Sequence, residues 1–211
     1  MIIKTLVVGP FEVNNYLVID EETKEAVLID AGGNFEATKK VLDENEAKLK
    51  CILNTHGHLD HIAGDQEIQE KLGVKVLCHK ADEFLVSALK QHLAHYGMPE
   101  YEIPRIDIFV EDEQEIVAGN MRFKVIHTPG HSPGAVCYLI DNVLFSGDTL
   151  FADAVGRTDL PGGSYDELKN SIQQKLFTLD DDIVVYPGHG SETTIGYEKA
   201  ENPFFGAKAS M

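Results

Sequence analysis

The sequence predicts an α/β protein in which two sheets pack face to face with helices on their outer sides, a four-layer αββα sandwich. Clusters of short apolar strands open each half of the 211-residue chain, and strands and helices alternate after each cluster. The halves also share a short pattern, since Leu28–Gly32 and Leu144–Asp148 each place an Asp near a Gly at the end of an apolar strand. We expect one domain over residues 1–211, because no linker-like or low-complexity segment divides the chain.

Three short strands are expected to open the first half, because its apolar runs are separated by turn residues such as Gly9-Pro10 and Asn14-Asn15. From Phe35 to Leu49, apolar residues recur at roughly helical spacing among Lys and Glu, which indicates an amphipathic surface helix. Strands and helices then alternate. The expected elements are strands at 2–8, 16–19, 26–29, 51–53 and 74–77 and helices over 35–49, 60–72 and 81–96.

The second half is expected to repeat this layout after an irregular stretch near Pro104. Asn120 and Asp141-Asn142 fit turns between consecutive short strands. The expected elements are strands at 115–118, 123–126, 135–140, 143–145 and 183–186, a helix over 165–177 and a short helical tail.

The chain carries a formal net charge of −17, and 43% of its residues are hydrophobic. This composition is typical of a folded globular protein, and so strong a negative charge repels polyanions. We therefore expect a small-molecule partner rather than nucleic acid or an anionic membrane surface. No apolar run is long enough to span a bilayer, and the first residues lack the features of a signal peptide.

The three cysteines, Cys51, Cys78 and Cys137, are far apart in the sequence, and each lies in an apolar run. An odd number of separated cysteines in such runs suits buried, reduced thiols better than disulfides. A cytoplasmic location is therefore expected.

Four potential metal ligands lie within six residues, directly after the buried strand that ends near Thr55: His56, His58, Asp60 and His61. Imidazole and carboxylate groups bind zinc, iron or manganese, whereas a structural zinc site more often uses thiolates. Gly57 lets the backbone bend so that the neighbouring rings can face one point. A lone His is usually an ordinary core or surface residue, but no core needs this many polar groups together. The run therefore predicts a metal site.

Three later segments share one pattern, in which an apolar strand leads through a Gly-containing turn to a residue of ligand type. These residues are His131, Asp148 and His189. Pro129-Gly130 and Pro187-Gly188 restrict the turns before two of them. Because all three would emerge at the carboxyl ends of strands, a common cleft can form there.

With these residues in this order, the chain resembles the metallo-β-lactamase-fold hydrolases over nearly its whole length. The residues that carry the resemblance are Asp30, the run from Thr55 to His61, His131, Asp148 and His189. It implies two divalent metal ions per chain, with zinc expected first and iron or manganese also suited. One ion would be bound by His56, His58 and His131, the other by Asp60, His61 and His189, and Asp148 would bridge both.

The resemblance also implies how these residues work. A hydroxide held between the two ions would be the nucleophile, because paired metals lower the pKa of water toward about 7 and polarise a carbonyl. Asp60 and Asp148 would be catalytic, with Asp60 orienting the hydroxide. Asp30 would accept hydrogen bonds from the signature loop, behind the ligands. The competing interpretation makes Asp30 a turn residue that caps Gly32-Gly33.

Among these hydrolases, the chain is most similar to the short, single-domain form of the glyoxalase II-like thioesterases. A bridging Asp148 favours thioesterases and lactonases over β-lactamases, and Gly156–Asp159, Pro187–Gly190 and Asn202–Phe204 resemble the short form. This resemblance implies an activity of the hydroxyacylglutathione hydrolase type on an acyl thioester. A thiolate is a competent leaving group, with a thiol pKa near about 8.5, so no side-chain proton donor is required.

Arg157 and Asp159 lie where that family has a basic residue and a Tyr that touch glutathione, and the helical C-terminal domain of full-length glyoxalase II is not expected here. Arg157 could hold a substrate carboxylate, whereas Asp159 would repel one. An ion pair between the two that shapes the loop is the other interpretation. Residues 92–104 lie where the family often has a substrate-facing insertion, although such helix ends are more often plain surface.

Two further interpretations stand beside the thioesterase. A persulfide dioxygenase of the same fold would hold a single iron through His56, His131 and Asp148. A non-catalytic metal-binding domain is the other, although degenerate members usually lose ligands and none is missing here. His79 and His127 fit no ligand position and are not expected to bind metal.

Overall fold

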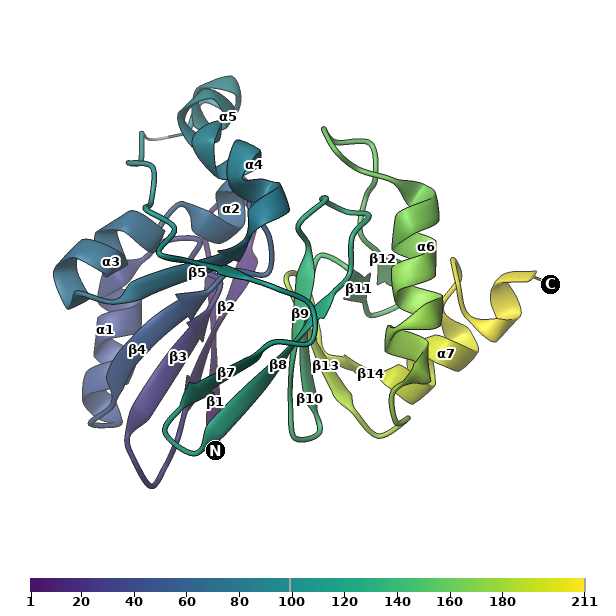
Figure 1. Cartoon of the computed structure of the whole chain (residues 1–211), viewed down its shortest axis with the longest axis horizontal. Coiled ribbons are helices and arrows are strands. Elements are labelled where there is room, and N and C mark those ends of the chain that lie inside the picture. The colour runs from purple at the N-terminus through teal and green to yellow at the C-terminus, as the bar shows by residue number, and fades with distance from the viewer. Residues whose placement is uncertain (99, 211) are drawn as a thin grey trace.

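The computed structural model describes residues 1–98 and 100–210 and contains two six-stranded sheets packed face to face. Helices cover the outer face of each sheet, so that the layers run helix, sheet, sheet, helix across Figure 1. The predicted four-layer α/β architecture is confirmed.

The first sheet follows the order of the chain and is antiparallel among its first three strands and parallel among the last four. Parallel neighbours end at the same edge of a sheet, so the segments that follow β3, β4 and β5 come together there. The six strands are β1 (Ile2–Val8), β2 (Val13–Ile19), β3 (Glu25–Ile29), β4 (Lys48–Leu53), β5 (Lys75–His79) and β6 (Ile108–Val110).

The helices of this half lie on the outer face of the sheet and over the edge where its parallel strands end (Figure 1). Asn34 caps the first outer-face helix, because its side chain accepts a hydrogen bond from the N–H of Ala37. The helices are α1 (Phe35–Glu44), α2 (Leu59–Ile62), α3 (Asp65–Leu72), the 3₁₀ turn η1 (Lys80–Asp82), α4 (Glu83–Ser87) and α5 (Leu89–His95).

The second sheet has the order β14-β13-β10-β9-β8-β7, and β8, β10 and β13 run in the same direction. Their carboxyl ends therefore face the same edge of the molecule. The strands are β7 (Glu115–Ala118), β8 (Met121–His127), β9 (Val136–Ile140), β10 (Val143–Gly147), β13 (Val184–Pro187) and β14 (Thr193–Thr194), with a small pair, β11 (Leu150–Phe151) and β12 (Ala154–Val155), beside them. The helices are α6 (Tyr165–Gln174), η2 (Leu176–Thr178), α7 (Ile195–Glu201) and η3 (Ala207–Ser210).

Each sheet buries both faces of its central strands. Phe123, Tyr138 and Phe145 belong to a cluster between the two sheets and are fully buried. On the outer faces, Ile52 packs in a cluster with the helices of the first half, and Leu144 does so with those of the second. Burial on both faces explains why the central strands read as continuous apolar runs.

One predicted helix ends earlier than expected, and another is divided in two. The helix expected over 35–49 stops at Glu44, because Glu46 adopts a left-handed φ of 52° and turns the chain into β4. The helix expected over 60–72 is divided at Gly64, whose N–H donates to the carbonyl of Ala31, 2.7 Å away. A Cβ at Gly64 would meet the backbone of Gly33, so this close approach requires glycine.

Other boundaries also differ. The helix expected over 81–96 is divided at Ala88, and the prediction missed β6, β11, β12 and β14, which have only two or three residues each. None of the helices in the described part of the chain has the length and apolar composition needed to cross a bilayer.

Candidate metal centre

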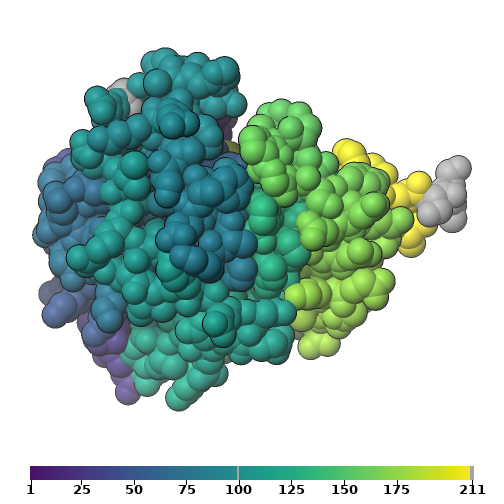
Figure 2. All heavy atoms as spheres, turned by 45° about the horizontal axis from the view of Figure 1, so that its top comes forward, coloured from purple at the N-terminus to yellow at the C-terminus, as the bar shows by residue number. Residues whose placement is uncertain are grey.

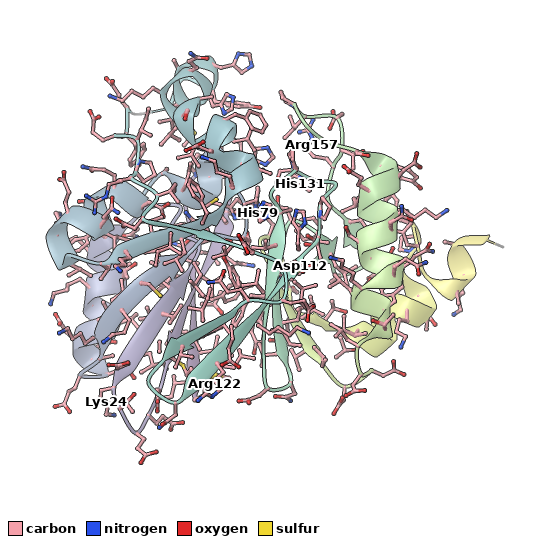
Figure 3. The ribbon with its side chains drawn as sticks, viewed as in Figure 1. Lys24, His79, Asp112, Arg122, His131 and Arg157 are labelled. Atoms are coloured by element: carbon pink, nitrogen blue, oxygen red, sulfur yellow. The ribbon has the colours of Figure 1, made fainter. Side chains whose placement is uncertain are left out.

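All seven predicted ligands lie together at the edge where strands of both sheets end. Four of them follow β4, and the others follow β8, β10 and β13. The rings of His56, His58, His61 and His131 are buried, whereas Asp60, Asp148 and His189 are half-buried and line a cavity. Figure 3 labels His131 and Arg157, which lie on the second-sheet side of this edge.

The ligand atoms form three overlapping groups, each within 4.8 Å: His56, His58 and His131; His56, His61 and Asp148; and Asp60, His61 and His189. In the first group, Nδ1 of His58 lies 2.9 Å from Nε2 of His131. In the third, Nε2 of His189 lies 3.3 Å from Oδ2 of Asp60. The first and third groups are the two triads that the resemblance implies.

Asp148 lies between those two triads. Its Oδ1 is 3.4 Å from Nε2 of His61, and its Oδ2 is 3.5 Å from Nε2 of His131 and 3.7 Å from Nε2 of His189. A carboxylate in this position reaches residues of both triads, as a bridging ligand must.

Three buried atoms that point into this cluster have no hydrogen-bond partner among the described residues: Nε2 of His56, Nε2 of His61 and Oδ1 of Asp148. Leaving a buried polar atom without a partner costs about 1–3 kcal/mol, so native proteins rarely concentrate several in one place. A divalent cation would supply the missing partner. The donor set, imidazole and carboxylate without thiolate, suits zinc, iron or manganese.

The pKa values of two histidines fit ligands as well, whereas, despite burial, the neighbouring carboxylates raise the pKa values of His61 and His189. Burial, reinforced by the neighbouring imidazole of His131, lowers the pKa of His58 to about 3, and burial also lowers the pKa of His56 well below its ordinary value. Both rings are therefore neutral and keep a lone pair for a metal. Burial alone would raise the pKa of Asp148, but the adjacent His61 lowers it below the usual range, so this carboxylate is ionised.

Asp30 supports the cluster from behind. Its Oδ1 accepts a hydrogen bond from the N–H of Thr55 at 2.7 Å, and its Oδ2 accepts one from the Thr55 hydroxyl and lies 2.8 Å from Nδ1 of His61. This contact leaves Nε2 of His61 facing the centre. The N–H of Gly32 donates to Asn15 instead, so the contacts agree with a supporting role for Asp30 rather than with a cap on Gly32-Gly33.

The turn before His189 is held by residues that the sequence analysis did not single out. The carbonyl of Pro187 accepts hydrogen bonds from the Asn14 amide at 3.0 Å and from the Tyr16 hydroxyl at 2.6 Å. A Cβ at Gly188 would lie 2.2 Å from Oδ1 of Asp148, so glycine is required there. The turn signal Pro187-Gly188 is visible in the sequence, but its partners in β2 are not.

Asp82 is a second residue that the prediction missed. It is fully buried and accepts hydrogen bonds from Gly57, Ser132 and Gly134. It follows β5 closely, as Asp30 follows β3, so the pattern of strand then Asp could have indicated it.

A cavity of about 480 Å³ opens onto the cluster. Besides the candidate ligands, it is lined mainly by apolar and aromatic groups and imidazoles from four segments: Phe11, Leu59, Leu85, His92, His95, Tyr96, Arg157, Leu160 and Pro161. His92, His95 and Tyr96 place α5 at the cavity, so this part of the 92–104 stretch is not plain surface. Figure 2 shows the teal α4–α5 segment and the light-green segment near residue 160 on opposite sides of the mouth.

Arg157 lines the cavity, but its guanidinium is paired. Its Nε and Nη2 donate to the two carboxylate oxygens of Asp159 at 2.7 and 2.8 Å. Its backbone carbonyl lies 2.8 Å from Nδ1 of His131 and so orients that ring. His79 and His127 stack on each other with ring centroids 4.2 Å apart and belong to none of the three groups.

A four-layer sandwich that carries His and Asp clusters at the strand ends defines a class of metal-dependent hydrolases. The chain belongs to the metallo-beta-lactamase superfamily, whose sequence model matches residues 8–189.

Similar proteins of this superfamily are named for different activities. The chain is similar to hydroxyacylglutathione hydrolase GloC of Haemophilus influenzae, with 38% identity over 213 residues that cover 99% of this chain and 100% of GloC. It is also similar in structure to the B3 metallo-beta-lactamase BLEG-1, with 36% identity, a TM-score of 0.90 and 97% and 99% of the two chains covered. TTHA1623, solved in a di-iron-bound form, shows 34% identity, a TM-score of 0.86 and 95% and 99% coverage.

Proposed function

We propose that this protein is a dinuclear metal-dependent hydrolase of acyl thioesters, similar to glyoxalase II and of the hydroxyacylglutathione hydrolase type. The observation that carries the proposal is the position of Asp148 between two complete triads of ligand-type residues. The similarity to GloC supports the thioester as the bond that is cleaved.

Each triad would hold one divalent ion: His56, His58 and His131 one, and Asp60, His61 and His189 the other, with Asp148 shared. Zinc is the first expectation, and the di-iron form of TTHA1623 supports two positions and makes iron an alternative. When bound, the ions would lower the pKa of water and polarise the substrate carbonyl.

The residues of the chain then have separate tasks. Asp60 lines the cavity, and the adjacent His61 keeps its pKa below the ordinary value although burial alone would raise it, so its carboxylate is ionised and can accept a hydrogen bond from the attacking water. Asp148 contacts both triads and fixes their positions relative to each other. No side chain needs to protonate the leaving group, because a thiolate is stable near neutral pH.

The substrate is a small molecule that fits the cavity beside α5. Arg157 contacts its thiol portion, and Asp159 weakens that contact for anionic substrates because it already neutralises the guanidinium. The net charge of −17 supports the exclusion of nucleic acids and anionic membranes. Three buried, unpaired cysteines support a reducing compartment, the cytoplasm.

The proposal is tested with protein reconstituted with zinc, iron or manganese and assayed against S-lactoylglutathione, other acyl thioesters, lactones and a β-lactam. We expect thioesters to be hydrolysed with the highest kcat/KM. His58→Ala should abolish the activity, whereas His127→Ala, which changes a histidine outside the three groups, should keep it.

Three results would contradict the proposal. A preference for the β-lactam would place the protein with BLEG-1. One iron per chain with oxygen uptake on glutathione persulfide would identify a persulfide dioxygenase. Metal binding without turnover of any substrate in the panel would identify a non-catalytic metal-binding domain.

A further inference from the structure

We infer that Asp82 is a positioning residue that clamps the loop carrying His56 and His58 to the loop carrying His131, and that it thereby sets the metal affinity of that triad alone. The inference rests on the proposed metal centre and concerns how the chain holds one of its two positions.

The Asp82 side chain is fully buried and uses both carboxylate oxygens. Its Oδ2 accepts hydrogen bonds from the N–H of Gly57 at 2.9 Å and from the Ser132 hydroxyl at 2.7 Å, and its Oδ1 accepts one from the N–H of Gly134 at 2.6 Å. No Lys or Arg in the described ranges lies within 4 Å of it. A buried carboxylate without a basic partner is costly unless strong hydrogen bonds offset its lost hydration, so three such donors indicate a specific task.

Two of the three donors stand directly beside a candidate ligand, and Gly134 follows three residues after His131. Gly57 lies between His56 and His58, and Ser132 directly follows His131. The two loops come from different sheets, since one follows β4 and the other follows β8. Their rings meet where Nδ1 of His58 lies 2.9 Å from Nε2 of His131, and the Asp82 carboxylate joins the two backbones behind that meeting point.

The surrounding backbone is shaped to this carboxylate. A Cβ at Gly134 would lie 2.7 Å from Cγ of Asp82, and one at Gly57 would lie 3.0 Å from its backbone carbonyl. Side chains at these two positions would therefore push the donors away. Other bonds between the two sheets in this region, from Val136 to Thr55 and from Tyr138 to Asn54, hold the chain before the first ligand and not between the ligands.

The other triad has its own supports. Asp30 orients His61, and the Asn14 and Tyr16 side chains hold the turn before His189. None of these contacts involves Asp82. Loss of Asp82 should therefore weaken one metal position and spare the other.

The test is a metal titration of Asp82→Asn, with bound zinc counted by elemental analysis. Asparagine keeps the size of the side chain but turns one oxygen into an NH₂ group, which opposes an N–H or O–H donor. We expect two zinc ions in the unchanged protein. In the variant we expect one ion to bind with unchanged affinity and the other to bind about 10- to 100-fold more weakly. This is the usual effect of removing a group that orients ligands.

Glu198→Gln is the matched control. Glu198 is also fully buried and accepts hydrogen bonds from Thr193 and Asn202, and none of its partners belongs to the triads. The control variant should melt earlier but bind both ions normally. Ser132→Ala, which removes a single donor, should weaken the same position by a smaller factor and decides the matter if Asp82→Asn does not fold.

Double variants identify the position that is affected. In a His189→Ala background, adding Asp82→Asn should remove the remaining tight ion, whereas in a His58→Ala background it should change nothing. If Asp82→Asn bound both zinc ions with unchanged affinity, or bound both more weakly by the same factor, the inference would be overturned. The proposed hydrolase activity would still stand. If the protein without substitutions binds no metal, the proposed function itself is refuted.

Discussion

Asp30 and Asp148 are the aspartates of the short pattern that the two halves of the chain share, yet their side chains have different surroundings. Asp30 is fully buried and turns both oxygens toward the protein, on Thr55 and His61. Asp148 keeps an oxygen without a hydrogen-bond partner among the described residues and faces the ligand rings and the cavity. The comparison shows that one local pattern serves two tasks, with support in the first half and proposed ligation in the second.

The comparison predicts unequal effects of removing the two carboxylates. Asp148→Ala should lower kcat/KM for a thioester by roughly 10³-fold or more, because a ligand shared by both triads is lost. The measurement is steady-state hydrolysis at saturating metal. Asp166→Asn, which changes an exposed residue of α6, should keep full activity. If kcat/KM of Asp148→Ala stayed within about tenfold of the value for the protein without substitutions, Asp148 would not be a ligand shared by both triads.

Removal of metal should destabilise the fold, because unpartnered atoms of both halves meet at the centre. With free metal at 1,000 times the Kd, binding adds about 4 kcal/mol, which for a chain of this size raises Tm by about 8–16 °C. Thermal melts with and without a chelator measure the shift. Equal melting temperatures would mean that the centre holds no metal under those conditions.

Asp30→Asn should have an intermediate effect. The amide cannot accept from both Thr55 and His61 as the carboxylate does, so we expect metal affinity at the His61 triad to fall about 10- to 100-fold. Competition with a chromophoric chelator resolves the two positions. If Asp30→Asn instead lowered the metal affinity of the triad that contains His58, the assignment of Asp30 to one triad and Asp82 to the other would be contradicted.

Asp159→Asn should have the smallest effect. Its ion pair with Arg157 is exposed and screened by solvent, so freeing the guanidinium should lower KM for a carboxylate-bearing thioester by only about two- to fivefold. A neutral thioester serves as the control and should be unaffected. Equal changes for both substrates would argue against a contact between Arg157 and substrate.

Residues close together in sequence were the easiest to predict. The run His56–His61 stands out on its own, and His131, Asp148 and His189 follow strands whose apolar patterns are plain. Asp82 could not be identified as a clamp, because its donors at positions 57, 132 and 134 become neighbours only when two sheets pack. The helix over 35–49 was predicted too long because Leu49 is buried in β4 and so continues the apolar spacing past the left-handed turn at Glu46.

The division of ligands between the two sheets also bears on folding kinetics. The turn from His56 to His61 is held by Asp30 and Asp82, which lie 25 to 31 residues away in sequence. His131 reaches His58 across 73 residues, and the contact joins the two sheets. Distant contacts form late because closing long loops costs chain entropy. A metal ion added during refolding therefore finds its full set of ligands only after the two sheets have docked, and its uptake measures the rate of that step.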